Sequence, residues 1–202
     1  MQRDGSSRKP AFSHGSNRTC PVLTQDLADS LDAVPPVTRP EPPLSGDERA
    51  MVTVWLDYQR ATLEWKCEGL DDQDLVRRAV PPSTLSLLGL VRHMTIVEWF
   101  WFERIFRAGN GTKPISTDDD PDADFNDLSF DRAESDLDLF RRQCDVSRGT
   151  VATAGSLDDI AASTARGEIS LRSIMIHMIE EYARHNGHAD FLRELIDGAV
   201  GE

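Results

Sequence analysis

A run of apolar residues between positions 84 and 106 constrains the fold of this chain more than any other feature. The segment reads TLSLLGLVRHMTIVEWFWFERIF and places apolar side chains around most of a helical circumference. A helix of this kind is stable only when other elements cover it on several sides, so we expect it to be central in its domain. Ser83 is the expected N-cap, and the helix should end near Gly109.

Three further segments have helical periodicity. One begins at Ser45, where Ser45 and Glu48 have the spacing of a capping box. Another runs from about residue 131 to 152, and the last runs from Ser170 to a stop at Gly198. The expected apolar stripe of the first of these helices is formed by Met51, Trp55, Tyr58, Thr62 and Trp65. No segment has a convincing strand pattern, which favours an all-α fold, an up-and-down four-helix bundle.

Two stretches differ from this helical pattern. Residues 1–44 hold seven of the eleven prolines, so we expect a disordered or loosely packed N-terminal extension before a bundle that spans 45–200. Residues 118–138 are rich in acidic side chains. We expect the first part of this stretch to be a solvated loop, because Asp and Asn compete for backbone hydrogen bonds.

Composition excludes several classes of function. The net charge of −13 disfavours nucleic-acid binding, because phosphate backbones repel an acidic protein. No apolar run approaches the length of a membrane span and no signal-peptide core is present, so we expect a cytoplasmic protein. The three cysteines, Cys20, Cys67 and Cys144, form neither an even disulfide set nor a CxxC motif. Any metal ion should therefore be held by histidines and carboxylates.

Three polar residues interrupt the apolar stripe of the last predicted helix. Glu181, His185 and His188 fall within about one-sixth of a turn of each other, on the arc defined by the apolar residues before and after them. Buried carboxylates and imidazoles are costly unless they are paired or bind a metal ion. Glu181 and His185 lie at i and i+4, so their side chains can converge on one ion. His188 is either a further ligand or a residue at the pocket mouth.

His93 is the candidate ligand from a neighbouring helix, because it is a lone histidine in an otherwise apolar segment. Glu98 is a candidate partner for that histidine. In an alternative without metal, Glu181 pairs with Arg184 or with Arg92 across the bundle. His177, one turn before Glu181, is a fourth ligand, a proton shuttle or a solvated residue; we favour the last.

The segments PPSTLSLLGLVRHMTIVEWFWFER and SLRSIMIHMIEEYARHNGHADFLRELIDG resemble the DinB-like metal-binding superfamily, specifically its DUF664 branch, over about residues 45–200. That superfamily has one His on the second helix and an H-x3-H pair on the last. His93 matches the first position and His185 matches the second His of the pair. Glu181 replaces the first His of the pair, as in relatives of mycothiol-dependent maleylpyruvate isomerase. The resemblance implies a four-helix bundle, often dimeric, that holds a divalent metal such as zinc or nickel.

The resemblance also implies thiol-dependent chemistry, since relatives include bacillithiol and mycothiol S-transferases and thiol-dependent isomerases. We therefore expect a metal-dependent transferase or isomerase that takes a small-molecule substrate and a low-molecular-weight thiol. His188 or Glu98 would move the proton, and Arg92 and Arg184 would hold carboxylates of the thiol or substrate.

Two other functions would use the same residues. Two histidines and one carboxylate are also the ligand set of non-haem Fe(II) enzymes. In a non-catalytic bundle the metal would only tie two helices together, and His177 or His188 would complete a closed shell of four ligands.

Overall fold

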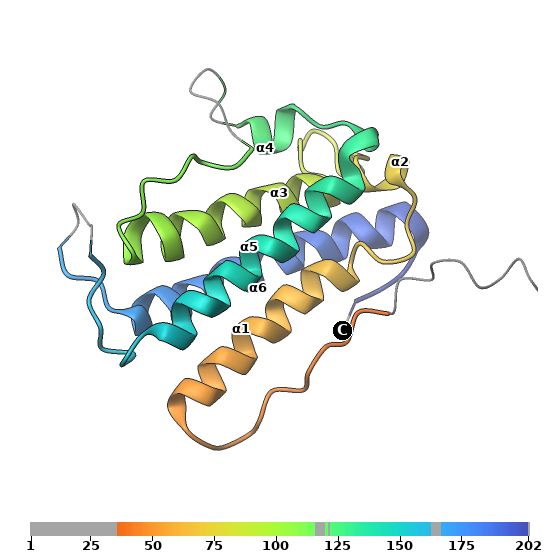
Figure 1. The fold of residues 1–202 in the computed structure, drawn as a ribbon. Coiled ribbons are helices and arrows are strands. Elements are labelled where there is room, and N and C mark those ends of the chain that lie inside the picture. Colours follow the sequence, from red (N-terminus) through yellow and green to blue (C-terminus); the bar gives the residue numbers. More distant parts are fainter. Residues whose placement is uncertain (1–35, 116–119, 121, 163–166, 202) are drawn as a thin grey trace, which may run out of the picture. The chain divides into compact units, whose positions relative to one another are not determined.

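The computed structural model describes residues 36–115, 120, 122–162 and 167–201 (Figure 1). Most of the predicted N-terminal extension, residues 1–44, therefore lies outside the described residues. No helix in the described part of the chain is long and apolar enough to cross a membrane.

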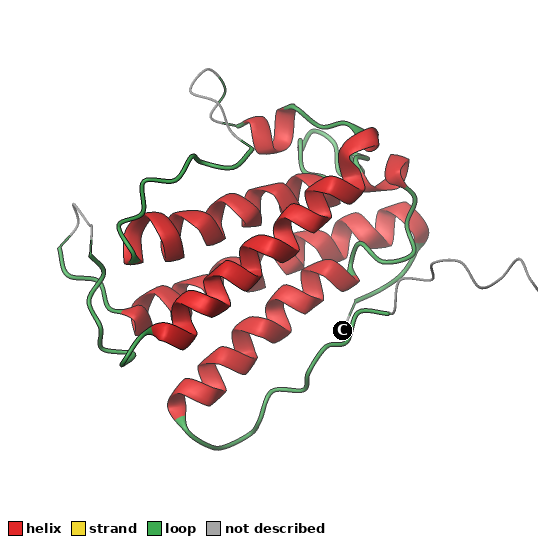
Figure 2. Cartoon of the chain, viewed as in Figure 1, coloured by secondary structure: helices red, strands yellow, loops and turns green. Residues whose placement is uncertain are grey.

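Long helices dominate the described residues, which contain no β-strand (Figure 2). The long helices are α1 (Glu48–Trp65), α3 (Leu87–Glu98), α5 (Ala133–Thr153) and α6 (Leu171–Asp197). A π-helix, η1 (Trp99–Phe106), continues α3. The short helices are α2 (Asp72–Leu75), α4 (Ala123–Asn126) and η2 (Phe130–Arg132). The predicted all-α bundle is confirmed.

The observed helix ends agree only in part with the caps predicted from the sequence. Ser170 caps α6, and Gly198 ends it in the left-handed conformation with φ of 81°, as predicted. The other two predicted N-caps are wrong. Asp47, not Ser45, caps α1 by accepting a hydrogen bond from the Ala50 amide, and α3 begins one turn later than expected with Ser86 as its cap.

The direction of the long helices differs from strict alternation. Side-chain bonds join α1 and α6 in the same order along both helices, from Glu48–Arg172 to Gln59–Asn186, so these two helices are parallel. By the same argument α3 and α5 are parallel, and Figure 1 shows both running opposite to α1 and α6. Because α3 and α5 are consecutive and parallel, the connection between them must return along the bundle. This return brings α4 against α3.

The π-helix changes which residues face the bundle. In η1 the backbone hydrogen bonds join residues five positions apart, which widens each turn. The angular positions of side chains around α3 therefore cannot be extrapolated beyond Glu98. Among the aromatic residues at 99–102, Phe100 would lie closest in angle to His93 in a regular helix, yet Phe100 is 41% exposed. Phe102 is instead completely buried.

The buried faces of α1 and α6 also differ from the predicted stripes. Trp55, a member of the predicted stripe of α1, is 41% exposed, and Leu195 near the end of α6 is 54% exposed. In α6 the buried stripe continues through Tyr182, Asn186 and Ala189. Glu181, His185 and His188 therefore lie beside the core stripe and are partly buried.

Candidate metal centre

Histidines from two helices meet between α3 and α6. The ring centres of His93 on α3 and His185 on α6 are 4.8 Å apart. The ring centre of His188 is 5.3 Å from that of His185, and their Nδ1 atoms are 3.4 Å apart. The side chain of His93 is 27% exposed and that of His185 is 12% exposed. The structure thus brings three histidines proposed as ligands into one cluster at the edge of the core.

Asp124, which the sequence analysis missed, holds His93 in place. Asp124 Oδ2 lies 2.8 Å from His93 Nδ1, and the carboxylate side chain is 7% exposed. The Phe125 ring packs against the imidazole with a centroid distance of 5.2 Å. A carboxylate on Nδ1 fixes the ring orientation and directs Nε2 to another partner, an arrangement common for metal-binding histidines.

The prediction that the first part of the acidic stretch is a solvated loop is wrong for α4, which packs against α3. The Arg92 guanidinium donates to the carbonyl oxygens of Ala123 and Asp124 at 3.0 Å and 3.2 Å, and to Asp136 at 2.8 Å. A Cβ at Gly89 would lie only 3.0 Å from the Phe125 ring, so glycine allows the close approach of α4. The apolar residues on either side of Asp124, Ala123 and Phe125, were the available sequence signal.

Glu181 contacts histidines on both sides along α6. Its Oε2 lies 3.6 Å from His185 Nε2, and its Oε1 lies 3.6 Å from His177 Nε2. Arg184 Nη1 is also 3.5 Å from Oε1. The Glu181 side chain is 17% exposed, so its carboxylate faces the cluster from the edge of the core.

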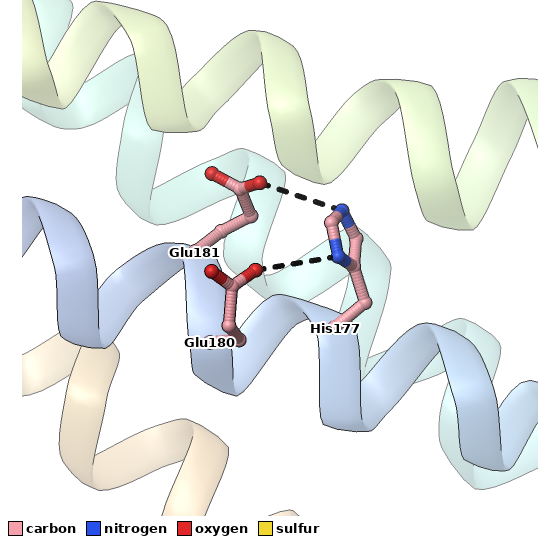
Figure 3. Close-up of side chains that lie close together, drawn as sticks. All are labelled: His177, Glu180 and Glu181. Carbon is pink, nitrogen blue, oxygen red and sulfur yellow. Dashed lines mark ion pairs between the residues drawn. The ribbon is translucent and has the colours of Figure 1, made fainter.

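A second group of metal-binding side chains shares Glu181. Among the described residues, the donor atoms of His177, Glu180 and Glu181 all lie within 4.8 Å of one another (Figure 3). The set of His93, Glu181 and His185 is not as compact in the described structure. Figure 3 shows both carboxylates pointing toward the His177 ring, all from one face of α6. His177 and Glu180 are 37% and 48% exposed, as in an ordinary surface ion pair on a helix.

Glu98 lies in a separate buried network. The Arg60 guanidinium binds both of its carboxylate oxygens, at 2.7 Å and 2.8 Å, and the Tyr182 hydroxyl donates to it at 2.8 Å. Cys144 Sγ is 3.8 Å from that hydroxyl. These contacts assign Glu98 to the bundle core. Arg184 is 54% exposed and pairs with Glu180 and Glu181.

Burial also sets the protonation states that matter for chemistry. Desolvation, followed by the charges of His93 and His188, lowers the pKa of His185 to about 4, so this imidazole is neutral at pH 7 and has the form that binds metals. Burial raises the pKa of the Cys67 thiol to about 12, and it raises that of Cys144 further. Neither buried thiol is a nucleophile at neutral pH.

An all-α bundle with histidines and a carboxylate clustered between its second and last long helices defines the DinB-like class of proteins. The family model described as Mycothiol-S-transferase matches residues 51–198, so the chain belongs to the mycothiol S-transferase family. This match confirms the DinB-like superfamily, while the DUF664 branch remains a prediction. No curated protein and no solved structure matches the chain. The family match indicates a mycothiol-dependent transferase of the DinB-like type.

Proposed function

We propose that this protein is a divalent-metal-dependent mycothiol S-transferase whose metal ligands are His93, Glu181 and His185. One observation carries the proposal: His93 and His185 face each other across two helices, and the buried carboxylate of Asp124 anchors His93. Bundles build metal sites from side chains on facing helices in this way. Zinc is the favoured ion because imidazole and carboxylate ligands suit it.

The donor chemistry supports this set over the group around His177. Asp124 Oδ1 is buried and has no hydrogen-bond partner among the described residues, so the carboxylate retains acceptor capacity beside His93. The His177 group comes from α6 alone, and Arg184 already neutralises Glu180. Three ligands from two helices leave an open coordination position, which is typical of catalytic sites.

Each residue of the cluster then has a separate role in the reaction. A bound divalent metal would favour the thiolate form of mycothiol, the nucleophilic form. His188 accepts the proton that the thiol loses, and the sulfur attacks an electrophilic carbon of the second substrate. The bond from that carbon to a leaving group breaks as the S–C bond forms, and the leaving group departs with the electron pair and takes up the proton from His188 or from water. Arg184, at the exposed rim, would exchange its ion pairs with Glu180 and Glu181 for anionic groups of a substrate. Glu98 and Arg92 stabilise the bundle and α4 instead of contacting a substrate.

Metal analysis of protein purified without a histidine tag tests the proposal. We expect about one metal ion per chain in the parent, loss of the ion in His93→Ala and His185→Ala, and retention in His177→Ala. The last variant is the matched control, because it removes a histidine of α6 that belongs to the alternative group. Loss of metal in His177→Ala alone would assign the ion to the other group and contradict the ligand set.

Activity is tested separately by following mycothiol consumption with an electrophile such as monobromobimane. The metal-loaded parent should consume thiol faster than the His93→Ala variant. The same ligands also suit Fe(II). Iron in the purified protein, with oxygen uptake but no mycothiol conjugation, would favour an oxygenase instead. A bound metal that changes neither rate would mean a stabilising role only.

A further inference from the structure

A pocket of about 380 Å³ lies along the end of α3 and the π-helix η1. Its volume is within the range of small-molecule sites. Most of its wall is aromatic or aliphatic, and two side chains are basic. The lining residues are Ile96, Val97, Trp99, Phe100, Trp101, Arg104 and Lys113. We call it the aromatic pocket.

The rings of the aromatic pocket are held in a defined arrangement. Phe100 and Trp101 pack edge to face, with ring centres 5.4 Å apart and an interplanar angle of 82°. The segment after η1 returns over Trp99, since a Cβ at Gly111 would lie 3.8 Å from Trp99 Nε1. This return brings Lys113 to the pocket wall.

The charge of the aromatic pocket is opposite to that of the whole chain, which is −13. Within the described part of the chain, neither Arg104 nor Lys113 has a carboxylate partner; Arg104 has only a 3.5 Å contact to the Gly109 carbonyl oxygen. By contrast, the arginines of α5 and α6 form ion pairs at several positions, among them Arg141, Arg148 and Arg172. Two cations without a carboxylate partner among the residues described, beside apolar rings, suit a ligand that is both apolar and anionic.

The aromatic pocket begins one helical turn from the proposed ligand His93. The Trp101 ring contacts the His177 ring, with centres 4.8 Å apart. His177 in turn lies 3.6 Å from Glu181. Ile96 and Val97 follow His93 by three and four residues, so they share its face of α3. A molecule in the pocket would therefore lie about one helical turn from His93, on the same side of α3.

We propose that the aromatic pocket binds the electrophilic second substrate, and that this substrate has an aromatic or otherwise apolar body with a carboxylate. The proposal rests on the proposed transferase function and names its substrate class. The rings of Trp99, Phe100 and Trp101 contact the apolar body. Arg104 and Lys113 bind the carboxylate.

Calorimetric titration with 2-naphthoate and with its neutral analogue 2-naphthamide tests the proposal. We expect naphthoate to bind the parent more tightly than naphthamide. The double variant Arg104→Gln/Lys113→Gln should weaken naphthoate about tenfold and leave naphthamide unchanged. Phe100→Ala should weaken both ligands. The matched control is Arg107→Gln, which removes an exposed arginine that does not line the pocket.

Equal affinity for the two ligands, or unchanged naphthoate binding in the double variant, would overturn the proposal. The proposal would also be overturned if light scattering showed that the parent is a dimer and that Phe100→Ser is a monomer, because a second copy of the chain would then cover the pocket. The titrations need neither metal nor thiol. Naphthoate binding without transferase activity would therefore reject the function alone, while activity on neutral electrophiles without naphthoate binding would reject the pocket alone.

Discussion

The orientation of each imidazole in the histidine cluster depends on the side chains that contact it. Asp124 is the clearest case, because its carboxylate holds the Nδ1 side of His93 while Phe125 packs against the ring. A carboxylate in that position orients an imidazole and increases its basicity as a ligand. Asp124 is thus a positioning residue for the proposed metal ligand.

Asp124→Asn should lower metal affinity by about 10–100-fold, because the amide retains the shape of the side chain but not its charge. Competition with a chromogenic chelator measures the affinity. Asp122→Asn, a neighbouring change outside this contact, should leave it unaltered. Unchanged metal affinity in Asp124→Asn would show that the hydrogen bond to His93 has only a packing role.

The lowered pKa of His185 predicts a pH dependence of stability in the metal-free protein. In the unfolded chain this imidazole gains a proton below its ordinary pKa of 6.5, whereas in the folded chain it does so only near 4. The unfolded state therefore binds more protons between these values, and the free energy of unfolding falls as the pH drops from 6.5 to 4 and then levels off.

The decrease due to His185 alone should be up to about 3 kcal/mol. Urea denaturation of the parent and of His185→Asn, both with chelator, measures the free energy of unfolding across this pH range. The contribution of His185 is the change with pH in the difference between the two proteins. A difference that stays constant from pH 7 to pH 4 would mean that the folded-state pKa is not lowered.

At the scale of elements, α1, α3 and α6 are joined by a charged network inside the core. Glu98 is completely buried and Arg60 is 3% exposed, and Tyr182 from α6 donates to the same carboxylate. Two buried charges that neutralise each other are tolerated, but a single one is costly. The network ties α3 to α1 and α6 independently of any metal.

Glu98→Gln should therefore reduce the free energy of unfolding by about 3 kcal/mol, because the buried Arg60 charge then keeps only Asp57, which is 26% exposed, as its counter-ion. Chemical denaturation measures the loss. The double variant Arg60→Met/Glu98→Leu should lose less, since it removes both charges. A double variant less stable than the single one would contradict this account.

At the scale of the whole molecule, the directions of the helices bring the proposed metal ligands together. α3 and α6 are antiparallel neighbours, and the proposed ligands come from both. An ion held between them binds only the folded state, so it stabilises the folded bundle.

A free metal concentration about 100 times the dissociation constant should add about 2.7 kcal/mol to the free energy of unfolding. For a chain of this length, that corresponds to a rise in Tm of about 5–10 °C. Thermal unfolding with and without chelator measures the shift. His177→Ala should keep the shift and His93→Ala should lose it; a full shift in His93→Ala would place the ion elsewhere.

The sequence by itself determined the long helices and the residues from which the cluster is drawn. Helical periodicity and caps such as Ser170 and Gly198 act within a few residues, so they can be read locally. The spacing of Glu181 and His185 brought both to one side of α6, which the structure also shows.

Only the tertiary structure decided which residues meet across the bundle. Asp124 contacts His93 from 31 positions away, and Arg60 reaches Glu98 across 38. The return of the chain between α3 and α5 creates the first contact, and the register of α1 against α3 creates the second. Such pairs depend on how whole helices pack, and no local pattern encodes that packing.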